Sequence, residues 1–234
     1  MTPGEPACKS SPECPICNDA GFIHPRREDG TVDYGAVVPC QCQAEKMARE
    51  KAEFLLRYCG LPAESEDKTF KTFKERTEEI RKAKVAALMM AQGDETIIFL
   101  TLMSDTGLGK SHLAIAICRV WLGRGMTVKY CFVPELLDEL RASYHRDETT
   151  GISHSQLFDT LRNCQLLVLD DLGTEKKSDW AREQLQSIID HRARNAMPMV
   201  VTTNKTLAQL PNDDEGRIAS RLQREVWCKV VVLE

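Results

Sequence analysis

Residues 104–111 read Ser-Asp-Thr-Gly-Leu-Gly-Lys-Ser, and this stretch decides the fold of the chain. It follows an apolar run at 97–102 and precedes a helical pattern at 111–122. A strand, a glycine-rich turn and a helix in this order form the context in which a loop binds phosphate. The helix would direct the positive end of its dipole at the same anion. We therefore predict a nucleotide site at this loop.

Five residues of the loop are candidate ligands of ATP and its metal. Gly107-Leu108-Gly109 lets the backbone turn its N–H groups inward, where a Cβ would obstruct the chain. Lys110 is predicted to contact the β- and γ-phosphates, and Ser111 to ligate Mg²⁺. The loop departs from the G-x-x-x-x-G-K-[ST] pattern once, because Ser104 stands where the first glycine is expected.

A second stretch, residues 166–173, reads Leu-Leu-Val-Leu-Asp-Asp-Leu-Gly. At the end of this aliphatic strand, Asp170 is predicted to hold Mg²⁺ through water and Asp171 to polarise an attacking water. The alternative is a buried strand that happens to end in two acids at a solvated turn. The order of the two motifs and their spacing of about 60 residues favour a parallel α/β NTPase core.

Two further segments supply candidate catalytic groups. The strand at 199–202 leads into Asn204, which would hold the lytic water if the strand tip lies beside the acidic strand; otherwise Asn204 is an ordinary turn former. Arg217 and Arg221 lie four residues apart on one helix face. A solvated basic face is the default interpretation of such a pair, but beside an ATP site an arginine finger becomes the better one.

The composition limits the possible functions. The chain has 234 residues, of which 42% are hydrophobic, and a net charge of −4. This charge gives no support for nucleic-acid binding, so any such contact must be local. No apolar run approaches the roughly 18 residues of a membrane span. The N-terminus lacks the basic start and apolar stretch of a secretion signal. We expect a cytoplasmic protein without membrane contact.

Half of the ten cysteines crowd into the first 42 residues. The pairs Cys14/Cys17 and Cys40/Cys42 enclose a loop and are predicted to hold one Zn²⁺ with four thiolates. Cys8 and His24 are spare ligands if one of the four is not used. A C-x-x-C redox pair and free cysteines in a disordered tail are the alternatives. The segment is too short and polar to fold on an apolar core, so a metal would supply its stability.

The order of predicted elements indicates an α/β protein with a parallel sheet between helices. We divide the chain into a cysteine-rich module with an amphipathic helix (1–60), a connector and helix (61–95) and an ATPase core (96–234). The predicted helices are 43–58, 75–92, 111–122, 134–145, 154–163, 180–193 and 215–225. The predicted strands are 97–102, 127–132, 165–169, 199–202 and 229–233.

In this order the motifs resemble those of AAA+ ATPases of the DnaC and IstB type, which are helicase loaders and transposition helper ATPases. The matching stretches are 107–114, 166–175, 188–192, 201–204 and 216–222. Phe70-Lys-Thr-Phe73 resembles the connector that precedes the core in this family. The resemblance covers about residues 61–234, and the cysteine-bearing N-terminus resembles that of some phage and Gram-positive loaders. It implies an AAA+ core with a small zinc-ribbon-like module.

Position by position, the resemblance implies Lys110 and Ser111 as Walker A, Asp170 and Asp171 as Walker B, and Asn204 as sensor 1. Arg221 matches the finger that reaches a neighbour's ATP, with Arg217 beside it. The second Walker B acid is Asp171, where many AAA+ proteins have the longer glutamate. The given sequence stops just before the position where the family places a second sensor arginine, so the chain is either truncated or lacks that contact. Both departures favour weak, regulated hydrolysis.

The resemblance therefore implies an ATP-dependent loader of a replicative DNA helicase of the hexameric DnaB type. Such a loader would form homo-oligomers with ATP, contact single-stranded DNA and use its N-terminal module to grip the helicase. A transposition helper ATPase is the first alternative. A nucleotide-gated adaptor that does not hydrolyse ATP is the second, and Ser104 and Asp171 are the residues that favour it.

Overall fold

The structure is a computed structural model that describes residues 13–144, 153–176, 178–210, 217–223 and 226–234. The chain divides into two compact units, Met1–Glu53 and Phe54–Glu234. The boundary falls inside the helix α1 (Gln41–Cys59), so it lies before residue 60, where the sequence suggested the module would end. The further division at residue 95 stays a prediction.

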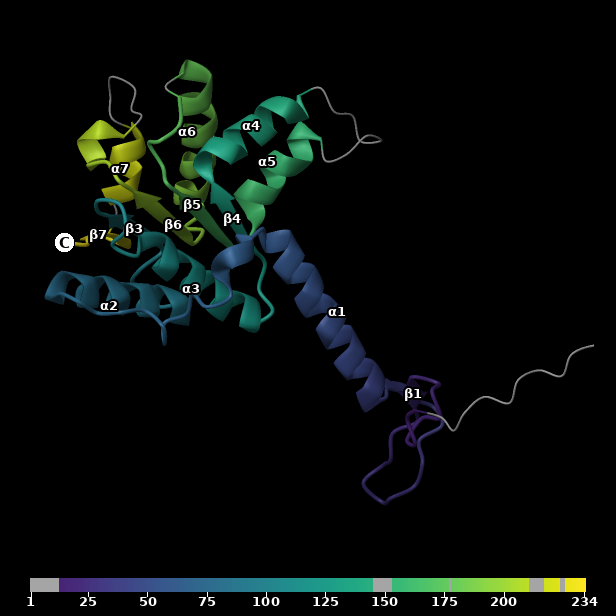
Figure 1. Cartoon of the computed structure of the whole chain (residues 1–234). Coiled ribbons are helices and arrows are strands. Elements are labelled where there is room, and N and C mark those ends of the chain that lie inside the picture. The colour runs from purple at the N-terminus through teal and green to yellow at the C-terminus, as the bar shows by residue number, and fades with distance from the viewer. Residues whose placement is uncertain (1–12, 145–152, 177, 211–216, 224–225) are drawn as a thin grey trace, which may run out of the picture. The chain divides into compact units, whose positions relative to one another are not determined.

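The larger unit alternates helices and strands along the chain (Figure 1). Its helices are the C-terminal end of α1, α2 (Glu78–Gln92), α3 (Lys110–Gly123), α4 (Val133–Ser143), α5 (His154–Asn163), α6 (Asp179–Arg194) and α7 (Arg217–Gln223), with short 3₁₀ turns η1 (Ala63–Ser65) and η2 (Leu207–Gln209). Its strands are β3 (Phe99–Met103), β4 (Val128–Phe132), β5 (Leu166–Asp170), β6 (Met199–Thr203) and β7 (Cys228–Val232).

These strands form one parallel sheet in the order β4-β5-β6-β3-β7. The predicted α/β class with a parallel sheet is thereby confirmed. The strand that precedes the glycine-rich loop, β3, lies beside β6, and β6 lies beside the acidic strand β5. Because the strands are parallel, the loop, Asp170 and Asn204 follow strand ends at the same edge of the sheet.

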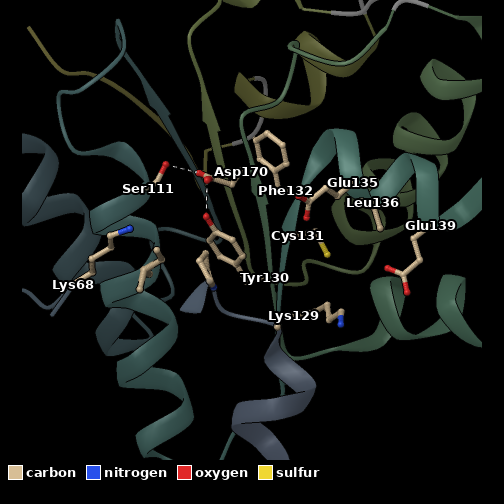
Figure 2. A pocket seen from close by; sticks show the side chains of 13 residues that line it. Lys68, Ser111, Lys129, Tyr130, Cys131, Phe132, Glu135, Leu136, Glu139 and Asp170 are labelled. Carbon is tan, nitrogen blue, oxygen red and sulfur yellow. Dashed lines mark hydrogen bonds between the residues drawn. The ribbon is translucent and has the colours of Figure 1, made fainter. Parts of the chain in front are cut away.

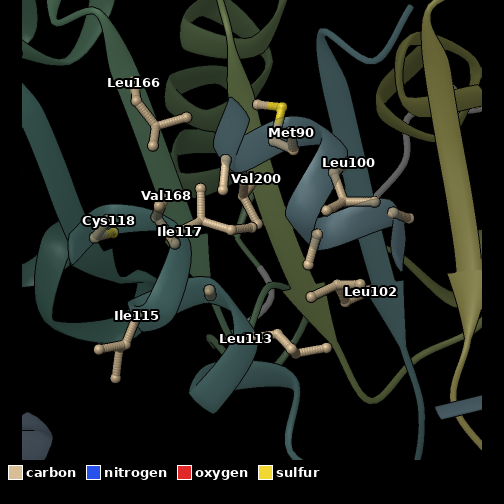
Figure 3. Packing of buried hydrophobic residues seen from close by; sticks show 14 of the residues in the cluster. Met90, Leu100, Leu102, Leu113, Ile115, Ile117, Cys118, Leu166, Val168 and Val200 are labelled. Carbon is tan, nitrogen blue, oxygen red and sulfur yellow. The ribbon is translucent and has the colours of Figure 1, made fainter. Parts of the chain in front are cut away.

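The sheet separates two apolar layers, as the period of two along each strand requires. On one face α2 and α3 pack against alternate strand residues such as Leu100, Val168 and Val200 (Figure 3). On the other face α4, α5, α6 and α7 pack against the intervening residues, such as Leu167 and Val201 (Figure 1). All five of these side chains are at most 1% exposed, so both faces of the sheet are covered.

The predicted element boundaries lie within three residues of those in the structure, and local capping fixes several of the helix starts. Helix α2 begins three residues later than predicted, after Thr77, whose side chain accepts a hydrogen bond from the Ile80 N–H. Helix α5 has the predicted bounds and begins after Ser153, which forms a reciprocal capping box with Gln156. Helix α7 begins at Arg217 in the structure. Residues 215, 216, 224 and 225 of the predicted helix 215–225 lie outside the described part of the chain, as does residue 145 at the end of the predicted helix 134–145.

The smaller unit has almost no apolar interior. A two-residue antiparallel pair joins β1 (Phe22–Ile23) to β2 (Val38–Pro39), and α1 follows. Among residues 13–53, the buried hydrophobic side chains are Cys17 and Cys40. In contrast, Phe22 and Tyr34 are more than half exposed. A fold of this kind needs a source of stability other than apolar burial.

Candidate nucleotide site and metal centre

The glycine-rich loop has the backbone that its sequence predicts. Gly107 and Gly109 both have positive φ, of 89° and 94°, which L side chains rarely adopt. At Gly109 a Cβ would also come within 2.7 Å of the Phe73 ring. Ser104 is not among the residues with positive φ, so the backbone at this position does not require the glycine that the pattern asks for.

Lys110 is buried at the centre of the loop, and its ammonium group is surrounded by acceptors. Nζ donates to the Ser104 carbonyl (3.0 Å), the Ser104 hydroxyl (3.0 Å) and the Asp105 carbonyl (2.9 Å). It also donates to Oδ1 of Asn204 (2.6 Å), at the end of the neighbouring strand β6. Burial lowers the pKa of Lys110, although the charges of Asp171 and Asp170 oppose the shift. A phosphate at this loop would therefore replace acceptors that the protein itself supplies.

Asp170 ends β5 and is 5% exposed. Its Oδ1 accepts hydrogen bonds from the Ser111 hydroxyl at 3.0 Å and the Thr202 hydroxyl at 2.6 Å. Its Oδ2 accepts from the phenol of Tyr130 on β4. Three hydroxyl donors from three different elements thus fix one carboxylate directly beside Ser111.

Asp171 follows in a left-handed conformation, with φ of 59°, which aspartate and asparagine tolerate better than most residues. Its backbone N–H donates to the Thr202 hydroxyl at 2.9 Å, so Thr202 holds both acids at once. Burial and then the charge of Asp170 raise the pKa of the Asp171 carboxyl, while Lys110 opposes this rise. Asp170 accepts three hydroxyl hydrogen bonds and Asp171 does not share them, so the two acids have different environments.

The segment before the core packs on the start of α3. His112 Nε2 hydrogen-bonds the Thr69 carbonyl at 2.8 Å, and the Phe73 ring meets the His112 ring edge-on at 5.2 Å between centroids. Arg119 donates to the Ser65 carbonyl at 2.8 Å. The connector that carries Phe70 and Phe73 is thus tied along α3 up to the glycine-rich loop.

Arg221 points toward a different element. Helix α7 packs against α6, β7 and β3, and the Arg221 guanidinium donates through Nε to Oδ1 of Asp190 at 2.8 Å. Arg217 lines a cavity of about 550 Å³ together with Asp190, His191 and Arg194. The structure therefore brings Lys110, Ser111, Asp170 and Asn204 together, and it places Arg217 and Arg221 on the surface formed by α6 and α7.

The four paired cysteines of the smaller unit converge, and their sulfur atoms all lie within 4.8 Å of one another. Sγ–Sγ separations are 3.8 Å for Cys14 and Cys40 and 3.5 Å for Cys17 and Cys42. A tetrahedron with Zn–S bonds of about 2.3 Å has edges of about 3.8 Å, whereas a disulfide would need about 2.05 Å. The donor set and its spacing fit a closed structural zinc site and not a disulfide pair.

The environment of the cluster favours thiolate at one member. Backbone amides of Cys17 and Ile16 lower the pKa of Cys14 to about 7. Hydrogen bonding from the Cys17 side chain raises the pKa of Cys42 to about 12. His24, the spare ligand, instead contacts the Ala36 carbonyl through Nδ1 at 2.8 Å, and Cys8 lies outside the described residues.

Cys59, Cys118, Cys131 and Cys164 of the larger unit are buried and Cys228 is partly buried, and none of these five takes part in a disulfide. Sequence reasoning missed Tyr130 and Thr202, the hydroxyl groups that hold Asp170. It also missed Asp190, the partner of Arg221, although residue 190 lies inside a stretch that resembles the family. Tyr130 had one available signal, since it is a polar ring at an inward position of an otherwise apolar strand pattern.

The comparisons with known proteins agree with this geometry. Residues 24–212 match the family described as IstB-like ATP binding protein. The replicative helicase loader DnaC of Escherichia coli (strain K12) is 29% identical over 117 residues, which cover 50% of this chain and 46% of DnaC. The chain thus spans about half the length of such curated relatives.

Two solved structures share the fold. A crystal structure of the DnaC helicase loader is similar with a TM-score of 0.58 at 24% identity, and the match covers 74% of this chain and all of that one. AMPPCP-bound DnaA from Aquifex aeolicus is similar with a TM-score of 0.62 at 17% identity, over 72% of this chain and 50% of that one.

In the part of the chain that the structure describes, the helices are too short or too polar to cross a membrane. The chain shares its parallel-sheet fold with these two solved structures, and the family match covers most of the sequence, including the glycine-rich loop and both acids. The chain belongs to the family of IstB-like ATP-binding proteins.

Proposed function

We propose that the chain is an ATP-dependent loader of a replicative DNA helicase, which hydrolyses ATP slowly at interfaces between its own copies. The observation that carries the ATP site is the joining of Lys110, Ser111, Asp170 and Asn204 in one hydrogen-bonded group at the sheet edge. The name of the relative DnaC and the cysteine cluster together favour a loader.

In this proposal the residues have separate roles. Backbone N–H groups of Gly107, Leu108 and Gly109 surround the phosphates, and Lys110 exchanges its internal acceptors for the β- and γ-phosphates. Ser111 and Asp170 hold Mg²⁺, which neutralises charge on the phosphates when bound. Asp171 polarises the attacking water and Asn204 positions it. The short side chain of Asp171, where many AAA+ proteins have glutamate, favours slow turnover.

Arg221 is assigned to the ATP of a neighbouring copy. Its partner Asp190 holds it on the surface of α6 and α7, where a second copy would meet it. Charge stabilisation by such a residue accelerates hydrolysis by about 10³-fold or more. Arg221→Ala should therefore bind ATP as a monomer like the parent and lose assembly-dependent hydrolysis.

A mixing experiment tests this arrangement. Arg221→Ala and Lys110→Ala are each expected to be inactive, yet together they should recover part of the hydrolysis, because an intact Arg221 can face an intact Lys110 across one interface. If Arg221→Ala alone hydrolyses ATP at the rate of the parent, the assignment of Arg221 to the ATP of a neighbouring copy is wrong. An inactive mixture that demonstrably co-assembles would exclude the arrangement between copies.

A row of rings and cations on α4, α5 and α6 supports the contact with single-stranded DNA. The Tyr144 and His154 rings stack at 4.0 Å, and His154 stacks on Phe158 at 5.3 Å. The Arg141 guanidinium lies 4.7 Å from the Trp180 ring, whose centroid is 6.3 Å from that of Tyr144. Tyr144 is 51% exposed. Phe158 is buried, and His154 and Trp180 are half-buried. An exposed ring beside arginine, such as Tyr144, is suited to stacking a base without sequence preference.

The zinc module supplies the second contact of a loader, since it is a separate compact unit whose apolar side chains face outward. Phe22, Tyr34 and Val37 are 51%, 77% and 62% exposed. In this proposal the module, held by Zn²⁺ at Cys14, Cys17, Cys40 and Cys42, grips the helicase. A transposition helper is the second candidate, and the family description IstB-like favours it.

A reconstituted loading assay separates these functions. The chain, ATP, the helicase of its host and circular single-stranded DNA should yield DNA-bound helicase, and the same mixture with the host's transposase should yield no stimulated strand transfer. Tyr144→Ala should lose loading, whereas Tyr144→Phe keeps the ring and should retain it. Stimulated strand transfer without helicase loading would replace the proposed function with the second candidate.

A further inference from the structure

Tyr130 is a buried ionisable residue that the roles proposed above do not use. It lies on β4 and is 6% exposed, and its phenol donates to Oδ2 of Asp170. Figure 2 shows the two hydrogen bonds that join Ser111 to Asp170 and Tyr130 to Asp170, with the carboxylate between the two hydroxyl groups. Ser111 and Tyr130 therefore approach the same carboxylate through different oxygens.

The chemistry of this contact has a fixed direction. An ionised carboxylate can only accept hydrogen bonds, so the Tyr130 phenol is the donor to Oδ2 of Asp170. On the other oxygen, Oδ1, the donors are Ser111 and Thr202.

The two donors on Oδ1 are not equivalent once a metal is bound. If Ser111 turns its oxygen to Mg²⁺, Thr202 is the hydroxyl that stays on Oδ1, and Tyr130 is the one that stays on Oδ2. Asp170 also borders a cavity of about 620 Å³ that Tyr130, Lys68 and Glu135 line (Figure 2). Without the phenol, Oδ2 would face water from this cavity and the carboxylate could rotate.

We propose that Tyr130 is a positioning residue for the metal of the ATP site, because it fixes the orientation of Asp170 when Ser111 moves to the metal. The proposal rests on the proposed ATPase function and assigns to Tyr130 a role that the sequence motifs do not include. A ring without the hydroxyl would fill the same space in the core. The hydroxyl therefore contributes orientation at Asp170 and little to packing.

The test measures metal binding directly. Mn²⁺ serves as the probe, and electron paramagnetic resonance counts free Mn²⁺ in the presence of the full chain and ATP. Tyr130→Phe should weaken Mn²⁺ binding to the ATP complex by about tenfold or more, as expected for the loss of one hydrogen bond to a charged acceptor. Affinity for ATP in the presence of a chelator should stay within about twofold of the parent.

Tyr58→Phe is the matched control. It removes a phenol oxygen from the same part of the unit, where Tyr58 lies under the ammonium of Lys129 and not beside Asp170. This variant should bind Mn²⁺ like the parent. Thr202→Val removes the other remaining donor of Asp170 and should weaken Mn²⁺ binding as Tyr130→Phe does.

Three results would overturn the inference. Unchanged Mn²⁺ affinity in Tyr130→Phe would make the phenol a core group that merely finds an acceptor. Equal losses of Mn²⁺ affinity and metal-free ATP affinity, or a variant that does not fold, would give Tyr130 a structural role. A parent chain that binds neither ATP nor Mn²⁺ with ATP would remove the proposed function, and the inference with it.

Discussion

The nucleotide end of the sheet and the cysteine cluster are assembled in opposite ways. Lys110 and Asp170 sit at the edge of a sheet whose two faces are covered by apolar side chains, and each is bonded to groups of the protein itself. Cys17 and Cys40 are themselves the buried hydrophobic side chains of residues 13–53. An apolar core supports the nucleotide site, whereas in the cysteine cluster the proposed metal ligands are themselves the buried side chains.

This difference predicts how each site responds to loss of a ligand. A sheet packed on both sides keeps its fold when one polar group at its edge is removed, because apolar burial supplies most of its stability. A unit without an apolar core takes its folding free energy from the metal. The same kind of substitution should thus abolish binding in one region and abolish the fold in the other.

The largest expected effect is the loss of the fold of the smaller unit in Cys42→Ser. The parent should contain about one equivalent of zinc, and the variant should contain well under one. The amide chemical shifts that report the β1–β2 pair should be lost from its nuclear magnetic resonance spectrum, because one thiolate of the four is missing from the closed site. Metal analysis and amide chemical shifts measure both outcomes.

Cys228→Ser is the matched control, because it changes a partly exposed cysteine of the larger unit. It should keep the zinc and the spectrum of the smaller unit. ATP binding should be nearly unchanged in Cys42→Ser. If the parent lacks zinc, with Cys14, Cys17, Cys40 and Cys42 freely alkylated, the cluster is not a metal site and the comparison fails on that side.

The next prediction concerns Lys110→Ala, which should leave the fold intact and strongly lower the affinity for ATP. Lys110→Ala should lower ATP affinity at least tenfold, since it loses a charge-assisted contact to phosphate worth about 1.5–3 kcal/mol. Its far-ultraviolet circular dichroism should match that of the parent. Titration with a fluorescent ATP analogue gives the affinity.

Lys129→Ala is the control for charge, because this lysine donates to the Tyr58 carbonyl, away from the glycine-rich loop. It should bind ATP with affinity close to that of the parent. Unchanged ATP affinity in Lys110→Ala would move the nucleotide site away from residues 104–111.

Much of the fold followed from local patterns. The positive φ of Gly107 and Gly109 and the burial of β5 follow from glycine-rich and aliphatic stretches that need no partner to be recognised. The parallel order of the strands places the loop, Asp170 and Asn204 at one edge, and the sequence order alone suggested this. Four residues of the proposed site could therefore be predicted from the sequence: Lys110, Ser111, Asp170 and Asn204.

What the sequence could not supply is the set of partners that come from distant elements. Tyr130 meets Asp170 because β4 lies beside β5 in register, with Phe132 opposite Asp170 and Tyr130 opposite Val168. Asp190 meets Arg221 only because α7 packs on α6. No spacing along the chain encodes these contacts, since they depend on which elements become neighbours.

The smallest expected effect concerns Asp171, and it shows that the nucleotide end also carries a cost in stability. Its pKa is raised above the usual 3.8 by burial and by Asp170, so the folded state binds more protons than the unfolded state just above pH 3.8. Stability should therefore fall as the pH rises through the folded pKa of Asp171. Asp171→Asn removes this charge and tolerates the left-handed backbone.

Asp171→Asn should raise the melting temperature of the nucleotide-free chain at pH 7 by about 1–2 °C, a small value because the carboxyl is partly screened by solvent. The gain should shrink as the pH is lowered through the folded pKa of Asp171, where the parent carboxyl takes up a proton, while hydrolysis is lost at every pH. Calorimetry between pH 4 and 7, with Asp105→Asn on the glycine-rich loop as control, measures the difference. A gain independent of pH, or a loss at pH 7, would mean that Asp171 is not under electrostatic strain and that the nucleotide end carries no such cost.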